Sequence, residues 1–288
     1  MNSKGGLLCM IYTISSKDTQ LQAIANTWGR HCDGFIAFSN ETNVDLHAVL
    51  SNHPGGESYH NMWSKAQYMW MTAATKMSHY DWFLIGGDDL FVSISALKYY
   101  LSSSGISDAH SRGMSLYIGR AMRESFHFIY NNGGSGYLLN SYALQELYTE
   151  LLQGCNGMAW TRIQSSKTTF NAGVSGNEGY SSIGVRASVE DMLVGYCLAR
   201  RGVFPIDTAD YDPTTTTPME TEGRGKERFH WHRPGAEFRS NGRLYSHLSV
   251  NAAPNLDCCS PHSVTFHYID SPTMMYCMHQ YLRAEGSM

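Results

Sequence analysis

The chain has 288 residues and a formal net charge of −4 at pH 7, and only 16% of its residues are charged. That length suits one large α/β domain or two small ones. No basic stretch stands out, so the sequence lacks the electrostatic footprint of a nucleic-acid-binding protein. No apolar run approaches the roughly 20 residues that a membrane span needs, and no signal peptide is visible.

The first half of the chain alternates between strand and helix patterns. Residues 7–13 form an apolar run typical of a buried strand, residues 18–28 carry apolar side chains at helical spacing, and residues 35–39 again suit a strand. This β-α-β order predicts a parallel sheet. The further elements predicted here are a helix over 59–77, a strand from Trp82, a short helix over 95–101 and a strand over 116–119.

The second half is predicted to be less regular. Ser141 is expected to cap a helix that ends near Gly154, and residues 156–187, rich in Gly, Ser, Thr and Asn, suit a long loop. Another helix opens at residues 188–191 and ends at Gly202, because glycine is common just past a helix C-terminus.

The organisation predicted from these patterns is a single domain over residues 1–288 with an irregular C-terminal third. Residues 212–225 include four consecutive threonines and are expected to be exposed and mobile. No internal repeat or interdomain linker is visible.

Two aspartates follow a hydrophobic strand. Asp88 and Asp89 come after the apolar run 82–85 and two glycines, with no cationic residue among them. Acidic groups at the carboxyl edge of a buried strand can hold a divalent metal, because Mg²⁺ and Mn²⁺ prefer oxygen ligands. The alternative is a tight turn with a solvated acidic tip.

A second acidic pair, Glu190 and Asp191, opens a predicted helix. Ser188 with Asp191 three residues later matches a capping box, which is a purely structural role. Alternatively, a carboxylate at a helix N-terminus that lines a cleft can act as a catalytic base.

A histidine-containing segment and a glycine-rich turn complete the candidate groups. His230 and His232 lie close together in the segment 228–234, and a neutral imidazole can complete a metal site begun by carboxylates. The turn 133–136 lacks the Lys and Ser/Thr that end a P-loop, which excludes an ATPase of that type. Its glycines allow the backbone to approach a ligand closely.

The cysteines alone leave the compartment open. None has the C-x-x-C spacing of a zinc site. They are either buried free thiols of a cytosolic enzyme, or two or three bridges with one thiol left over in an oxidising compartment. One glycosylation acceptor, Asn40-Glu41-Thr42, favours the second interpretation. The seven are Cys9, Cys32, Cys155, Cys197, Cys258, Cys259 and Cys277.

Several segments, spread over residues 7–282, match the motifs of one known family. They are Thr27 to Cys32, Asp81 to Val92, Gly133 to Leu139, Ser188 to Gly195, Cys197, Phe229-His230, Cys258-Cys259-Ser260, Val264 to Asp270 and Met274-Met275-Tyr276. On these segments the chain resembles the core 1 β1,3-galactosyltransferases, which extend O-linked N-acetylgalactosamine, in the wider family that includes fringe. The C-terminal block is the most specific, because fringe-type relatives do not generally share it.

The resemblance implies a fold and a reaction. The fold is an α/β, GT-A-type, Rossmann-like nucleotide-sugar-binding domain with a mixed, mostly parallel sheet and an irregular, disulfide-containing C-terminal part. Residues 1–155 would form the nucleotide-sugar and metal-binding half, and residues 156–288 the acceptor-side half. The reaction is a metal-dependent, inverting transfer of galactose from UDP-galactose in β1,3 linkage to N-acetylgalactosamine of O-glycoproteins, with Mn²⁺ or Mg²⁺ as cofactor.

The resemblance also implies roles for individual residues. Asp191, rather than Glu190, would be the catalytic base. The implied metal ligands are Asp89 and His230, with Asp88 binding directly or through its neighbours. The implied nucleotide contacts are Trp28, Asp88, Gly133, Gly134 and Glu190.

One position departs from the family pattern. The family usually shows three aspartates in the metal segment, and Gly87 stands at the first. The third, which maps to Asp89, is the metal ligand, whereas the first lies closer to the sugar and base of the nucleotide. Metal binding is therefore expected to survive, and the departure bears on nucleotide affinity or selectivity.

We predict two bridges, Cys9–Cys32 and Cys155–Cys197, a vicinal bridge Cys258–Cys259, and a free Cys277. The first bridge would tie a strand to the end of the next helix, and the second would clip the long loop to the Glu190–Asp191 helix. Each could stabilise the fold by about 2–4 kcal/mol.

Two alternatives to this function stay open. One is a fringe-like β1,3-N-acetylglucosaminyltransferase or another hexosyltransferase, and the other is an inactive carbohydrate-binding or chaperone-like relative. Inactive relatives typically lose the metal aspartates, whereas Asp88, Asp89, Asp191 and His230 are all present. The resemblance further implies the Golgi lumen with type II membrane topology, an O-GalNAc glycoprotein as acceptor, and no nucleic-acid partner; a homodimer is left open.

Overall fold

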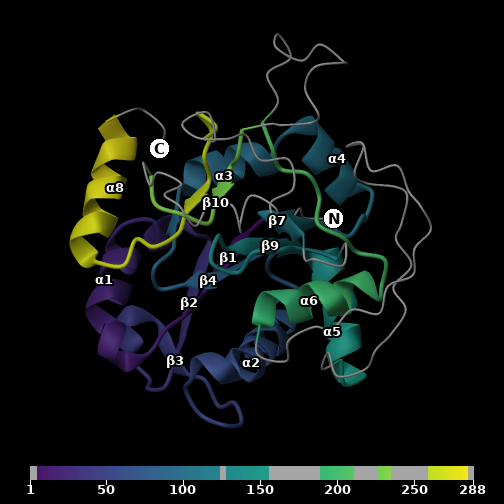
Figure 1. Ribbon diagram of the computed structural model, residues 1–288, viewed down its shortest axis with the longest axis horizontal. Coiled ribbons are helices and arrows are strands. Elements are labelled where there is room, and N and C mark those ends of the chain that lie inside the picture. The colour runs from purple at the N-terminus through teal and green to yellow at the C-terminus, as the bar shows by residue number, and fades with distance from the viewer. Residues whose placement is uncertain (1–4, 124–127, 156–188, 211–225, 235–258, 285–288) are drawn as a thin grey trace.

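A computed structural model describes residues 5–123, 128–155, 189–210, 226–234 and 259–284. The predicted loop over 156–187 and the predicted exposed segment over 212–225 lie outside these ranges. A six-stranded sheet forms the centre of the molecule and helices cover both of its faces (Figure 1).

The central sheet is mixed and mostly parallel. Its strand order is β3-β2-β1-β4-β9-β6, in which the first four strands pair in parallel and β9 is antiparallel to both of its neighbours. The α/β class predicted from the β-α-β order is confirmed. The strands are β1 (Leu7–Tyr12), β2 (Gly34–Ser39), β3 (Ala48–Leu50), β4 (Trp82–Gly87), β6 (Tyr117–Gly119) and β9 (Tyr137–Asn140).

Successive residues of β1 pack alternately into two separate hydrophobic cores. Leu8 and Met10 join the core on one face of the sheet, and Leu7, Cys9 and Ile11 join the core on the other. Because side chains alternate across a strand, a strand covered on both faces is apolar at every position. This explains the continuous apolar run from which the strand was predicted.

Each core is closed by its own set of helices. On one face α2 (Met62–Ala74), α5 (Ser141–Leu152) and α6 (Glu190–Ala199) pack together, and all ten residues of α6 are buried. The other core is built with α1 (Asp18–Asn26), α3 (Ile94–Leu101), α4 (Ser104–Ser111) and α8 (Pro272–Ala284). In Figure 1, α8 lies beside α1 at the left of the molecule.

Two short strands of the C-terminal part, β10 and β11, form a sheet with β5 from the first half of the chain. A three-stranded sheet has the order β10-β11-β5, and a hairpin is formed by β7 and β8. In the three-stranded sheet, β11 runs antiparallel to β5, the strand that follows the two aspartates. The bounds are β5 (Phe91–Val92), β7 (Ala121–Arg123), β8 (Ile129–Asn131), β10 (Phe229–His230) and β11 (Thr265–Phe266).

Some predicted helix ends are wrong. The α2 helix is shorter than 59–77, because Tyr59–Asn61 forms a separate 3-10 turn. Helix α5 is capped by Asn140 rather than Ser141: Asn140 has an extended backbone, and its side chain accepts a hydrogen bond from the Ala143 backbone N–H. The remaining 3-10 turns are Ser15–Lys17, Gly29–His31 and Val44–Leu46.

Two predicted disulfides are confirmed. Cys9–Cys32 ties β1 to the turn after α1, and Cys155–Cys197 ties the end of α5 to α6, with Cα atoms 6.1 and 6.0 Å apart. Cys277 is free and exposed, as predicted. The predicted vicinal bridge includes Cys258, which lies outside the described residues. These bridges favour an oxidising compartment over the cytosolic alternative.

No helix in the described ranges combines the length and the apolar character that crossing a bilayer requires.

Candidate active site

The carboxyl ends of β1 and β4 bring the first candidate residues together. The two strands are parallel neighbours, with Tyr12 opposite Gly87 in the register. Asp88 and Asp89 follow directly, at the sheet edge where ligands of open α/β sheets bind. The Thr13 hydroxyl donates a hydrogen bond of 2.7 Å to Asp88 Oδ2, which fixes that carboxylate against β1.

Asp89 meets a histidine from the C-terminal part. His267 Nε2 lies 3.2 Å from Asp89 Oδ2, and both side chains are partly open to solvent. The pairing of β11 with β5 brings His267 there, and the Ile269 backbone N–H donates to the Asp89 carbonyl at 2.8 Å. His267 Nδ1 lies 3.2 Å from the carbonyl of Trp231, which can only accept, so Nδ1 donates a proton there and Nε2 is the nitrogen that faces Asp89.

His230, predicted as the metal ligand, is seated elsewhere. It is fully buried, with Nε2 2.9 Å from Ser263 Oγ and Nδ1 3.6 Å from Glu227 Oε2. Among the described residues, the histidine that contacts Asp89 is therefore His267 and not His230. Sequence reasoning did not single out His267, although it lies in the 264–270 segment on which the family resemblance partly rests.

The second acidic pair occupies the first turn of α6. The N-cap of this helix is Val189, without a side-chain cap, and Ser188, on which the predicted capping box depends, lies outside the described residues. Asp191 instead accepts backbone hydrogen bonds from Gly133 N–H at 2.7 Å and Met192 N–H at 2.8 Å. Glu190 Oε2 accepts a 3.0 Å hydrogen bond from the Tyr137 hydroxyl.

The environments of these two carboxyl groups give them different pKa values. Burial, and then the Asp191 charge, raise the pKa of Glu190 to about 8. Burial also raises the pKa of Asp191, but the backbone N–H donors oppose it and leave the value at about 6. Near neutral pH Glu190 is therefore the protonated member and Asp191 the ionised one, a division typical of acid–base pairs.

A glycine turn connects the acidic pair of α6 to the Asp89–His267 pair. A Cβ on Gly133 would lie 2.5 Å from Glu190 Oε1, and a Cβ on Gly134 would overlap the His267 ring. Glycine is required at both positions, because the backbone passes between the two groups of side chains. The turn thus has Asp191 on one side and His267 on the other.

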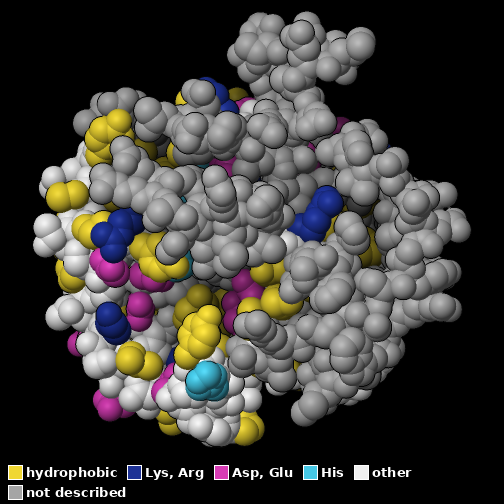
Figure 2. Space-filling model, in the orientation of Figure 1, with side chains coloured by type: hydrophobic (Ala, Val, Ile, Leu, Met, Phe, Trp, Pro, Cys, Tyr) yellow, Lys and Arg dark blue, Asp and Glu magenta, His cyan; other side chains and the backbone are white. Residues whose placement is uncertain are grey.

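The Tyr12 phenol interacts electrostatically with all four carboxylates. Burial raises the pKa of its phenol, and the charges of Glu190, Asp89, Asp191 and Asp88 raise it further. The two acidic pairs, predicted separately from the sequence, therefore belong to one site. In Figure 2 acidic side chains reach the surface near the middle of the face shown, close to one end of α6 in Figure 1.

Of the predicted nucleotide contacts, four lie at this site and one lies in the core. Trp28 is only 1% exposed and packs edge-on against Phe35, with ring centroids 6.3 Å apart. This burial indicates a packing role, and contact between Trp28 and a nucleotide stays a prediction. The four at the site are Asp88, Gly133, Gly134 and Glu190.

Tyr12 and Asp89 occupy the space that a side chain at Gly87 would need. A Cβ at residue 87 would lie 2.8 Å from Asp89 Oδ1, closer than real Cβ contacts allow, and 3.0 Å from the Tyr12 ring, tighter than most such contacts. We therefore expect Gly87→Asp to weaken UDP binding by displacing Asp89 or Tyr12, and Tyr12→Ala/Gly87→Asp to recover part of that loss. Titration calorimetry of UDP on the two single variants and the double variant measures this coupling. Strictly additive losses would contradict it.

The raised pKa of Glu190 predicts a pH-dependent stability. The folded-state pKa of Glu190, about 8, lies above its unfolded value. The contribution of the protonated Glu190 to the free energy of unfolding is therefore fully present below about pH 4.5, and it is lost as the pH rises through 8. Glu190→Gln lacks this titration, and we expect it to melt at least a few degrees above the native chain at pH 9 but close to it at pH 5. Melting curves in metal-free buffer measure the difference. The exposed Glu41→Gln is the matched control, and equal pH slopes for Glu190→Gln and the native chain would refute the assignment.

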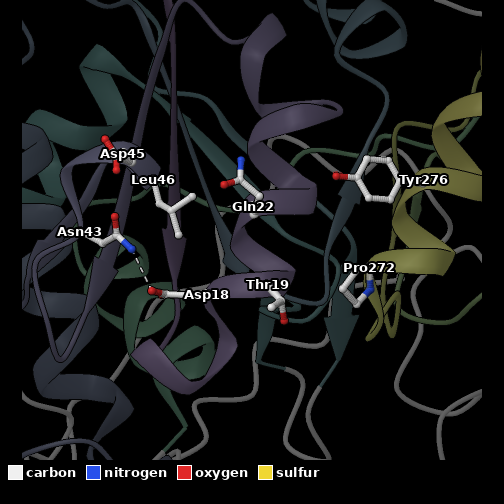
Figure 3. Close-up of a pocket in the computed structure, with 8 residues that line it drawn as sticks. All are labelled: Asp18, Thr19, Gln22, Asn43, Asp45, Leu46, Pro272 and Tyr276. Carbon is white, nitrogen blue, oxygen red and sulfur yellow. Dashed lines mark hydrogen bonds between the residues drawn. The ribbon is translucent and has the colours of Figure 1, made fainter.

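A pocket lies apart from this site. It is an open hollow of about 500 Å³ where α1, the Val44–Leu46 turn and α8 meet (Figure 3). Asn43 donates a 2.9 Å hydrogen bond to Asp18 at its wall, and Tyr276 faces it from α8. None of the residues predicted from the sequence to act in catalysis lines this pocket.

Comparisons with known proteins bear on what the site does. No family model matches the chain. A solved glycosyltransferase involved in glycosylation of the major capsid of PBCV-1 is 16% identical, with a TM-score of 0.35, over 54% of this chain and 68% of that chain, a similarity too low to support an argument. The glycoprotein-N-acetylgalactosamine 3-beta-galactosyltransferase 1 of Xenopus laevis is 25% identical over 295 residues, which span 99% of this chain and 69% of the relative. The resemblance predicted from the motifs is thereby confirmed: the chain is similar, over nearly its whole length, to a core 1 β1,3-galactosyltransferase.

Proposed function

We propose that this protein is an inverting, metal-dependent glycosyltransferase that moves galactose from UDP-galactose, in β1,3 linkage, to N-acetylgalactosamine of O-glycoproteins. The observation that carries the proposal is the Gly133–Gly134 turn, with the ionised Asp191 on one side and the Asp89–His267 pair on the other. The similarity of 99% of this chain to a glycoprotein-N-acetylgalactosamine 3-beta-galactosyltransferase supports the donor and the acceptor.

Asp89 and His267 are the residues that would hold the metal. A carboxylate oxygen and an imidazole nitrogen 3.2 Å apart are a donor set that Mn²⁺ accepts. With Nδ1 donating to the Trp231 carbonyl, Nε2 faces the Asp89 carboxylate, and a cation bound between them would be held by both groups. A bound Mn²⁺ supplies Lewis-acid neutralisation of the nucleotide diphosphate.

Asp191 would remove the proton of the acceptor hydroxyl as that oxygen attacks the anomeric carbon of the donor sugar. Its two backbone hydrogen bonds hold the carboxylate in place, and its position in the first turn of α6 favours the ionised form. Attack on the face opposite to the leaving nucleotide inverts the configuration, so no covalent enzyme intermediate is needed. Glu190, protonated near neutral pH, can donate a hydrogen bond to the donor but cannot accept the proton.

The metal and base residues come from both predicted halves of the chain. Asp89 and Gly133 belong to residues 1–155, whereas Asp191 and His267 belong to residues 156–288. We propose that donor binding involves both halves and that the acceptor enters on the Asp191 side. The disulfides agree with the Golgi lumen as the setting.

A donor screen tests this function. The release of UDP from UDP-galactose, UDP-N-acetylglucosamine and UDP-glucose is measured with a simple N-acetylgalactosaminide as acceptor, in Mn²⁺ and in EDTA. We expect acceptor-dependent release from UDP-galactose in Mn²⁺ only, and NMR of the product should show a β1,3 linkage. Preference for UDP-N-acetylglucosamine would support the fringe-like alternative. UDP binding without turnover of any donor would support an inactive, carbohydrate-binding relative.

A further inference from the structure

Lys65 is a buried cation beside the proposed active site, and the mechanism proposed above does not use it. It lies in α2 and is only 2% exposed. Its ammonium donates one hydrogen bond of 2.6 Å to the Thr13 carbonyl and one of 2.8 Å to each carboxylate oxygen of Glu57. An ammonium has three donor hydrogens, so all of them are used within the protein. Lys65 can therefore influence the reaction only through the groups that it holds.

Thr13 joins Lys65 to the donor side of the site. It follows β1 and is 4% exposed, and its backbone N–H donates a 2.9 Å hydrogen bond to the Phe38 carbonyl. Its carbonyl accepts from Lys65, and its hydroxyl donates to Asp88 at 2.7 Å. The hydroxyl has only one proton, and the Ile14 carbonyl, at 3.4 Å, is a second acceptor. The position of the Thr13 backbone therefore decides that this proton points to Asp88.

Glu57 stabilises the ammonium in this position. The side chains of Lys65 and Glu57 are 3% and 23% exposed, and a buried ammonium without a negative partner would cost free energy. Glu57 follows Gly55 and Gly56, which both have positive φ, and Asn61 Nδ2 donates a 2.7 Å hydrogen bond to the Gly56 carbonyl. These contacts fold the segment back onto the start of α2. The ion pair thus joins this segment, α2 and the end of β1.

The charges of Lys65 and Asp88 also interact directly. Burial lowers the pKa of the Lys65 ammonium, and the Glu57 hydrogen bond and the charges of Glu57 and Asp88 oppose that shift. Lys17 is another cation whose charge acts on Asp88, but Lys17 is exposed to solvent, which screens it. Lys65 is therefore linked to Asp88 in two ways, by hydrogen bonds through Thr13 and by its buried charge.

We propose that Lys65 is a positioning residue of the donor site, which fixes Thr13 at the end of β1 so that the Thr13 hydroxyl orients Asp88 toward the nucleotide sugar. Glu57 keeps the ammonium in place. This inference rests on the function proposed above. Residues that orient the groups in contact with a ligand typically change affinity or activity by about 10–100-fold. A residue that acts only in this way affects donor binding and leaves acceptor binding unchanged.

Lys65→Met keeps the length of the side chain and removes the ammonium. We expect it to weaken UDP binding in Mn²⁺ and to raise the KM for UDP-galactose at least about tenfold, with the KM for the acceptor unchanged. A merely structural role would instead reduce the folded fraction, and so lower kcat with both KM values unchanged, which would overturn the proposal. The matched control is Lys98→Met, which removes an exposed lysine paired with Asp33 at 3.0 Å and should bind UDP as the native chain does.

A double-mutant cycle tests the route through Thr13, whose hydroxyl is removed in Thr13→Val with little change in shape. Lys65→Met/Thr13→Val should bind UDP within about twofold of the weaker single variant, whereas losses that multiply would overturn the proposal. If Lys65→Met does not fold, Glu57→Ala replaces it in the cycle: it should weaken UDP binding alone but not in the Thr13→Val background, and unchanged affinity in Glu57→Ala would overturn the proposal. Failure of the native chain to bind UDP in Mn²⁺ would refute the proposed function itself, and this inference with it.

Discussion

Asp191→Asn is expected to lower turnover by at least about a hundredfold while the protein stays folded and binds UDP. Asp191 accepts from the Gly133 N–H with Oδ2 and from the Met192 N–H with Oδ1, and asparagine keeps an oxygen for only one of these donors, so we expect a modest loss of stability with α6 still formed. An amide, however, cannot take the acceptor's proton. Kinetics with UDP-galactose, a melting curve and UDP titration in Mn²⁺ together separate these effects.

Glu190→Gln is the matched variant for this experiment. Glu190 is protonated near neutral pH, so glutamine preserves its hydrogen-bonding form and should retain most of the turnover. Near-normal turnover in Asp191→Asn combined with an inactive Glu190→Gln would mean that the base is the other carboxylate. A large drop in the melting temperature of Asp191→Asn would instead favour a purely structural role at the helix start.

His267→Ala is expected to abolish metal-dependent UDP binding, and Asp89→Asn should do the same. His267→Ala removes the imidazole nitrogen that lies 3.2 Å from Asp89 Oδ2, and Asp89→Asn removes the negative charge of that carboxylate, which a divalent metal needs. Calorimetric titration of UDP with Mn²⁺ and with EDTA measures the metal-dependent part. In each variant the small affinity that remains should be equal in Mn²⁺ and in EDTA.

Controls distinguish His267 from the histidine predicted first. His262→Ala, in the same C-terminal segment but exposed, should bind UDP as the native chain does. His230→Asn should retain metal-dependent UDP binding if it folds, because His230 contacts Ser263 and Glu227 rather than Asp89. Loss of that binding in a folded His230→Asn, with binding retained in His267→Ala, would restore the original assignment.

The central sheet and its neighbouring helices were predictable because they are buried on both sides. The strands at 7–13, 35–39 and from Trp82 are continuous apolar runs, which is what double coverage by helices produces. Helix α8, Pro272–Ala284, was not predicted, although its start carries a capping signal: Ser271 precedes Pro272, and the Ser271 hydroxyl oxygen accepts a hydrogen bond from the Met274 N–H. Its Met275 is nevertheless completely buried in the core shared with α1.

The site was only partly predictable, because some of its residues are far apart in the sequence. Both acidic pairs could be recognised, because each follows a strand or opens a helix. The partner of Asp89 could not, because His267 reaches it through β5 and β11, two-residue strands too short to leave a periodic pattern. The choice between His230 and His267 depends on that pairing, and composition alone cannot make it.

The Cys155–Cys197 bridge has a consequence for how the chain can be altered. It joins two points 42 residues apart and thereby encloses the whole stretch 156–188 in a covalent ring. A protease cut anywhere in that stretch would leave the α6 helix tethered to α5, so the nicked protein would run as one band without reductant and as two with it.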